Sequence, residues 1–158
     1  MRPSHSILGL AVGLGLLGAL ACTTGGEPPS PTPANSEARE ALVQARASVD
    51  IFSGREPPSW ALSAEASRAL RQSLQALPKG SRPIPDVGLG YRGFMVAWAD
   101  GAQARVYRDV VEYTEAGRTV LLEDSGRKVE QGLLDGARPH LAPELFTTVE
   151  SQVQSAKP

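Results

Sequence analysis

The sequence predicts a single α+β domain, in which a small antiparallel sheet of three to five strands packs with two to four helices. Segment 91–122 alternates apolar and polar residues between turn signals, as half-buried antiparallel strands do. Segments 64–77 and 143–153 place apolar residues three or four positions apart, which is the spacing of a helix that buries one face. No internal repeat is visible, and about 120 residues after the N-terminal region suffice for one hydrophobic core.

The first two helices are predicted from caps and spacing. Ser36 is placed to cap a helix in which Ala38, Ala41, Leu42, Ala45 and Val49 share a face. Segment 49–52 is an alternative first strand, because Val, Ile and Phe favour strands. Segment 53–59 is a predicted loop, and Ser63 then caps the clearest helix, 64–77. Its expected apolar face is Ala66, Leu70, Leu74 and Leu77.

The second half of the chain predicts strands followed by helices. Segment 79–90 is a loop, and 91–99 is a strand with Phe94, Val96 and Trp98 on one face. After the Asp100-Gly101 turn, the predicted strands are 104–107, 110–114 and 119–122, with a turn at 115–118. A weak helix follows at 127–137, and a last helix starts near Pro143 with Leu145, Val149 and Val153 on one face.

The N-terminus has the features of an export signal. A short basic start precedes the apolar run 7–21, and small residues lie at its end. This run is Gly-rich and shorter than the about 20 apolar residues that a transmembrane helix needs. The only cysteine of the chain, Cys22, follows it directly.

The run Ala19-Leu20-Ala21-Cys22 resembles the relaxed lipobox of bacterial lipoproteins. The resemblance implies that Cys22 receives a diacylglyceryl thioether and becomes the acylated first residue of a membrane-anchored protein. Thr23 in place of Asp resembles lipoproteins sorted to the outer membrane. The alternative is an ordinary cleaved signal with a chance cysteine. We therefore expect a signal peptide at 1–21, a lipidated Pro-rich tether at 22–36 and one globular domain at 37–158.

The charge balance argues against a nucleic-acid partner. The chain has 16 basic and 17 acidic residues, and cleavage after Ala21 removes Arg2 and no acid, which leaves a net charge of −2. No clustered basic face accompanies this near-neutral balance. With no second cysteine for a disulfide, the domain must depend on its apolar core.

Two glycine-rich matches to the dinucleotide-binding pattern fail on context. Segment 13–18 lies in the predicted signal, and segment 88–93 follows a Pro-rich loop and enters a strand. A nucleotide site needs a strand before the glycines and a helix N-terminus after them. We expect no nucleotide and no cofactor.

Candidate catalytic residues are few. His140 is the only histidine left after cleavage, and without a free cysteine a zinc site would need several carboxylates beside it. We expect a structural role for His140 at a helix junction. The acidic residues are Asp109, Glu112, Glu115, Glu123 and Asp124, interleaved with Arg105, Arg108, Arg118 and Arg127. This pattern predicts cross-strand ion pairs on a solvated sheet face; a pair of acids across a sugar cleft is the alternative.

Trp60 is the candidate binding residue. The other aromatic side chains, with Phe94 and Trp98 foremost, are expected in the core, whereas Trp60 follows Pro57-Pro58-Ser59 in a predicted loop. A tryptophan there is either folded back as a lid on the core or exposed as an anchor for a partner.

A second resemblance concerns residues 49–107. A Leu62-Ser-x-Glu65 helix ending at Leu77-Pro78, the Pro85-Asp86 loop, Tyr91 and a strand ending at Asp100-Gly101 are similar to emfourin-type inhibitors of thermolysin-like proteases. The C-terminal part from Asp109 does not fit that pattern, and no inhibitory residue is carried over.

The sequence favours a non-catalytic envelope lipoprotein that binds a protein or cell-wall component. The alternatives are a protease inhibitor, an accessory docked permanently on an envelope assembly, and a hydrolase that uses the acids or His140.

Overall fold

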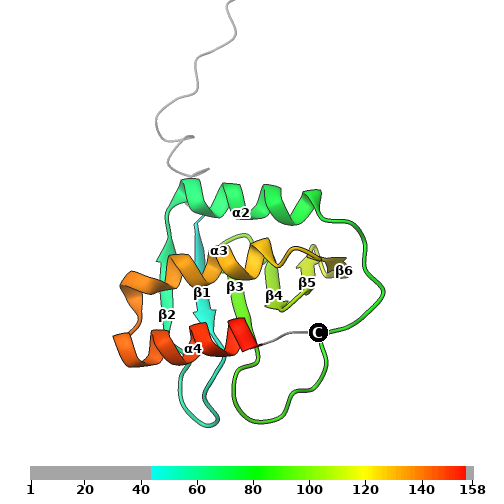
Figure 1. Cartoon of the computed structure of the whole chain (residues 1–158). Helices are drawn as coiled ribbons and strands as arrows, with labels where there is room; N and C mark the ends of the chain where they lie inside the picture. The colour runs from blue at the N-terminus through cyan, green and yellow to red at the C-terminus, as the bar shows by residue number, and fades with distance from the viewer. Residues whose placement is uncertain (1–43, 156–158) are drawn as a thin grey trace, which may run out of the picture. The chain divides into compact units, whose positions relative to one another are not determined.

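The computed structural model describes residues 44–155, which form an α+β domain (Figure 1). The predicted signal peptide, the lipobox with Cys22 and the tether lie outside the described residues. In chain order the elements are β1 (Ala45–Val49), β2 (Ser59–Leu62), α2 (Ala64–Ala76), β3 (Phe94–Trp98), β4 (Gln103–Tyr107), β5 (Val110–Glu115), β6 (Arg118–Glu123), α3 (Lys128–Ala137), a short 3₁₀ turn (Arg138–His140) and α4 (Pro143–Ser155).

The strands form one antiparallel sheet in the order β2-β1-β3-β4-β5-β6. The predicted fold class is confirmed, but the described residues contain six strands, one more than the largest number expected, with three α-helices. In Figure 1, α3 and α4 lie in front of the sheet and α2 runs across the upper ends of its strands. No helix within residues 44–155 combines the length and the hydropathy that a bilayer-spanning segment requires.

The prediction of a helix through residue 49 is wrong for its last turn, because residues 45–49 form β1. Ala45, Ala47 and Val49 are buried, while the side chains between them face away from the core. The backbone of β1 pairs with β2 on one side and β3 on the other. The helical preference of alanine is small, and this position between two strands outweighs it.

Helix α2 begins where predicted, since the Ser63 hydroxyl accepts a hydrogen bond from the Ala66 amide at 3.1 Å. Three of the four residues expected on its apolar face pack against the core, with Leu74 buried and Leu70 and Leu77 partly buried. Leu74 and Ser67 are fully buried, whereas Ala66 is exposed. The Ser67 hydroxyl accepts from the Ala45 amide at 3.1 Å, so a buried polar group joins α2 to the start of β1.

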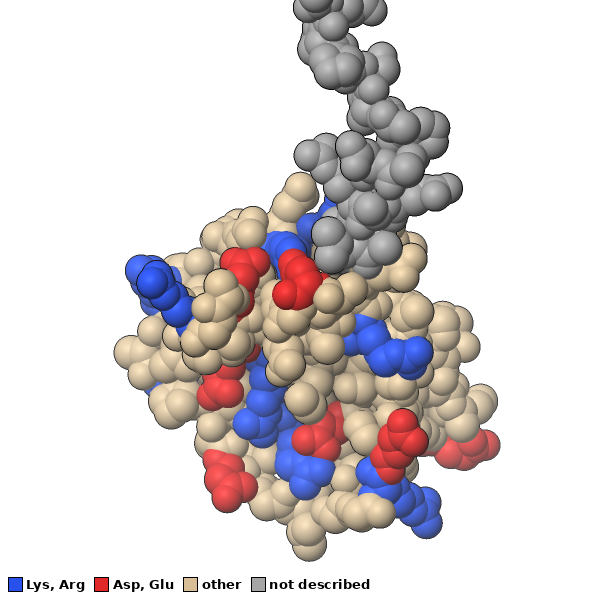
Figure 2. All heavy atoms as spheres, turned by 180° about the vertical axis from the view of Figure 1, so that it is seen from behind, with Lys and Arg blue, Asp and Glu red and all other residues tan. Residues whose placement is uncertain are grey.

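The strands of the second half follow the prediction closely. Phe94, Val96 and Trp98 of β3 are buried, and Met95 between them is exposed on the opposite face. Figure 2 views the molecule from behind, and this side carries positive and negative side chains intermixed. The sheet therefore has a core face under the helices and a face open to solvent.

The start of β3 requires a glycine. Gly93 has φ +104°, and a Cβ on it would lie 2.1 Å from the Val106 carbonyl oxygen of β4. The glycine-rich segment 88–93 thus leads into a strand, as predicted, and its last glycine permits close contact between two backbones.

One edge of the sheet is partly covered. The Gly80 amide donates to the Leu121 carbonyl and the Glu123 amide donates to the Pro78 carbonyl, both at 2.9 Å. Lys79 thereby forms an isolated bridge with Leu122 of β6. The chain leaving α2 therefore occupies the C-terminal half of the β6 edge.

Candidate functional site

An apolar groove of about 330 Å³ runs between α2 and α3. We call it the α2–α3 groove. Its α2 side is formed by Ala66, Ala69, Leu70 and Ser73. Its α3 side is formed by Lys128, Val129, Gly132, Leu133 and Gly136. Trp60 and Leu62 of β2 complete the lining, so the wall residues are mostly small and apolar.

Trp60 lines this groove from a strand, which corrects its expected position in a loop. Only 4% of its surface is exposed, so the alternative of a freely exposed tryptophan is wrong. Its ring packs edge-on against Phe94, with centroids 6.4 Å apart, and lies parallel to the imidazole of His140 at 5.9 Å. The indole Nε1 is buried and has no hydrogen-bond partner among the described residues. A buried donor without an acceptor is unfavourable by about 1–3 kcal/mol.

Two glycines of α3 line the groove. Gly132 and Gly136 lie one turn apart on α3 and are exposed, and a Cβ built on either would meet no atom within 4 Å. A glycine inside a helix destabilises it by about 0.5–1 kcal/mol relative to alanine. Internal packing does not explain this cost, whereas a close-fitting partner in the groove would.

His140 is the last residue of the 3₁₀ turn between α3 and α4, so its predicted position at a helix junction is confirmed. It is exposed and stacks on Trp60. Within residues 44–155 no group of three or more His, Cys, Asp or Glu side chains is arranged to hold a metal ion.

Four of the five acidic residues singled out in the sequence have separate structural partners, and the fifth, Glu123, is exposed. Asp109 pairs with Arg82, Glu112 accepts from the Ile84 amide at 2.9 Å, and Glu115 accepts from the Tyr113 hydroxyl at 2.9 Å. The prediction that these acids lie on a solvated face is wrong for Asp124, which is only 3% exposed. Its carboxylate accepts from the Lys128 and Val129 amides at 3.1 and 2.7 Å and so caps α3. Asp109 and Glu123 line one hollow of about 30 Å³, which is too small for a sugar ring.

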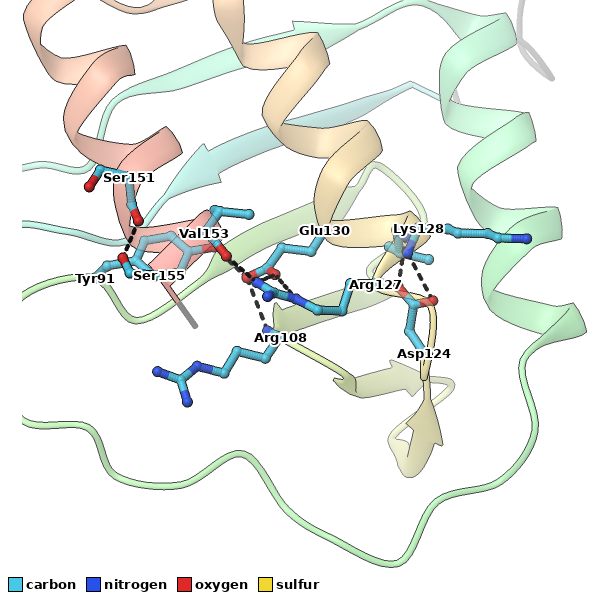
Figure 3. Close-up of polar contacts among 10 residues, drawn as sticks. Tyr91, Arg108, Asp124, Arg127, Lys128, Glu130, Ser151, Val153 and Ser155 are labelled. Carbon is cyan, nitrogen blue, oxygen red and sulfur yellow. Dashed lines mark hydrogen bonds and ion pairs between the residues drawn. The ribbon is translucent and has the colours of Figure 1, made fainter. Parts of the chain in front are cut away.

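The most deeply buried carboxylate, Glu130 of α3, was missed by sequence reasoning. Its side chain is 0% exposed and accepts from the Tyr91 hydroxyl at 2.7 Å and from the Arg108 amide at 3.0 Å (Figure 3). Arg127 donates to it through Nε at 3.0 Å and Nη2 at 2.5 Å. Arg127 Nη2 also donates to the Val153 carbonyl of α4 at 2.6 Å. We use the name Glu130 cluster for the side chains of Glu130, Tyr91 and Arg127 together with the Arg108 amide and the Val153 carbonyl.

The Glu130 cluster is structural in its chemistry. Burial, with the negative charge of Glu130 adding to it, raises the pKa of the Tyr91 hydroxyl well above its ordinary value. Tyr91 therefore stays protonated and serves as a donor. Each carboxylate oxygen of Glu130 has a donor, which is the condition for burying a charge without a large penalty.

Comparison with known proteins gives no relative: no family model, curated protein or solved structure matches this chain. The site is therefore interpreted from its own geometry.

Replacing Glu130 by Gln should lower the free energy of unfolding by about 2–4 kcal/mol, because the buried ion pair and its charge-assisted hydrogen bonds with Arg127 would be lost. Urea unfolding of the variant measures the loss. Glu123→Gln is the matched control, since Glu123 is exposed, and it should change stability by less than about 0.5 kcal/mol. Equal effects of the two substitutions would contradict the role given to Glu130.

Gly132→Ala and Gly136→Ala should each raise the free energy of unfolding by about 0.5–1 kcal/mol, because both sites have open space around a Cβ. Thermal and urea unfolding measure the gain. Gly93→Ala is the contrasting control and should destabilise the domain strongly, since its Cβ would clash with the β4 backbone. A loss of stability at position 132 or 136 would show that the glycine packs within the domain.

Proposed function

We propose that this chain is an envelope lipoprotein, anchored through acyl chains on Cys22, whose domain is a non-catalytic module that binds a partner protein in the α2–α3 groove. The observation that carries the proposal is the pair of exposed glycines on α3, which weaken their helix and have open space where a Cβ would lie.

The occupant that fits this groove is the C-terminal end of an apolar helix from the partner. Small residues on facing helices let a third helix approach closely, and helix-in-groove binding is a common mode of recognition. The last four carbonyl groups of a helix accept no hydrogen bond within it and carry the negative end of its dipole. Lys128, which lines the groove, complements the negative end of the helix dipole.

A non-catalytic role is supported by the fate of the candidate catalytic groups. Asp109, Glu112 and Asp124 are each engaged by a donor from the domain, and His140 stacks on Trp60. The outer membrane is the proposed location, from Thr23 after the cysteine. Inhibition of a thermolysin-like protease is the alternative function; titrating the domain against thermolysin tests it, and unchanged proteolysis at high molar excess removes it.

The anchor is tested by Cys22→Ser in a bacterial host supplied with an alkyne-labelled fatty acid. The wild-type chain should incorporate the label and partition into the detergent phase, because two or more acyl chains hold a protein firmly at a bilayer. The variant should lose both properties. Thr23→Ser, the neighbouring control, should keep them, and labelling of Cys22→Ser would contradict lipidation at this position.

The groove is tested with residues 37–158 as bait, a range that contains every buried core residue of the described domain. Ala69→Arg places a long charged side chain in the groove and should reduce retention of the envelope partner at least tenfold. Ala76→Arg is the matched control, because Ala76 is an exposed alanine of the same helix outside the groove. Equal retention by the two variants, or nothing retained by the wild type, would contradict groove binding.

A further inference from the structure

A second hollow lies at the β4–β5 turn and is separate from the α2–α3 groove. It has a volume of about 560 Å³, and we call it the Arg108 pocket. Its lining includes Arg82, Pro83, Pro85, Tyr107, Arg108 and Arg127. We propose that the Arg108 pocket binds a small organic anion, a carboxylate or a phosphate monoester joined to an apolar or ring-shaped body.

The backbone at Arg108 is held in an unusual conformation. Arg108 and Asp109 form the two-residue connection between β4 and β5, and Arg108 has φ +55°. Glycine, asparagine or aspartate normally occupies such a position, and strained positions of this kind concentrate at functional sites. The Arg108 amide donates to the buried carboxylate of Glu130 at 3.0 Å, which fixes the turn.

The Arg108 side chain is directed away from that carboxylate. Figure 3 shows the guanidinium extending from the turn on the side opposite to Glu130, while the backbone nitrogen faces Glu130. Its Cζ lies 5.1 Å from the centroid of the Tyr107 ring. A cation stacked on an aromatic ring keeps its N–H donors available at its edge.

The charges of the pocket leave Arg108 without an acidic counterpart. Arg82 pairs with Asp109, and Arg127 pairs with Glu130. Within residues 44–155 no carboxylate lies within ion-pair distance of the Arg108 guanidinium. The pocket therefore has one excess positive charge, and a planar guanidinium binds carboxylate and phosphate oxygens in a two-point arrangement.

The remaining wall indicates what carries the anion. The rings of Pro83 and Pro85, the Tyr107 ring and the Val110 side chain give the pocket an apolar side. A bare inorganic ion would leave this side unused. A ligand that places an aromatic, sugar or aliphatic body on it and its anion at Arg108 would use both.

The test is a titration of residues 37–158 with benzoate, phenyl phosphate and benzyl alcohol, followed by NMR shifts of backbone amides. The three probes share one apolar body and differ in carrying a carboxylate, a phosphate or no charge. We expect saturable shifts at 107–110 and 82–85 with one or both anions and none with benzyl alcohol. The tighter anion identifies the head group of the natural ligand.

Two variants make the assignment specific. Arg108→Gly removes the guanidinium, keeps the amide that Glu130 accepts from and tolerates the positive φ, so the domain should fold while anion affinity falls at least tenfold. Arg118→Ala removes the same charge from an exposed arginine at the start of β6, beside the far end of β5, and should leave affinity unchanged. No saturable binding of either anion, or equal effects of the two variants, would overturn the proposal.

Discussion

The buried contact between Glu130 and Arg127 connects parts of the chain that are far apart in sequence. Glu130 receives hydrogen bonds from the end of the long loop at Tyr91 and from the β4–β5 turn at Arg108, and Arg127 extends the network to the last helix at Val153. Each of these groups would be hydrated in the unfolded chain, so the cluster is favourable only when every member is present. This network adds to the apolar contacts that hold α3 and α4 on the sheet.

The first turn of α3 is held by many contacts, and the later part of the helix by fewer. Asp124 and the Glu130 cluster immobilise its first turn, where the amides of Lys128 and Val129 are satisfied by a carboxylate. Further along, Gly132 and Gly136 have no side chains, so the surface of α3 is recessed where it faces the groove beside α2. A well-fixed beginning thus allows a helix with two destabilising glycines to keep its position. The α2–α3 groove lies along this helix, and the Arg108 pocket is lined by its N-cap residue, Arg127.

Sequence reasoning succeeded where the pattern is local. The alternation in β3 to β6, the Ser63 cap and the turns at Asp100-Gly101 and 115–118 each depend on neighbouring residues, and all were placed. It failed where tertiary contacts decide. The alanines of β1 fit a helix equally well by sequence, and only their pairing with β2 and β3 makes them a strand. Glu130 has the spacing of a surface acid, and only its contacts with Tyr91 and Arg127 show that it is buried. Trp60 was singled out correctly as unusual, but the groove beside it needs two helices that the sequence does not align.

The bridge between Lys79 and Leu122 restricts how copies of this domain can associate. An uncovered edge strand offers its amides and carbonyls to any similar strand nearby, and proteins concentrated on a surface meet such edges often. Here the segment after α2 takes up the carbonyl of Leu121 and the amide of Glu123, so a second molecule could add a strand only along residues 118–120. Three residues make too short a ladder to hold another chain, and β2 at the other edge is only four residues long. Many copies could therefore crowd together without joining their sheets.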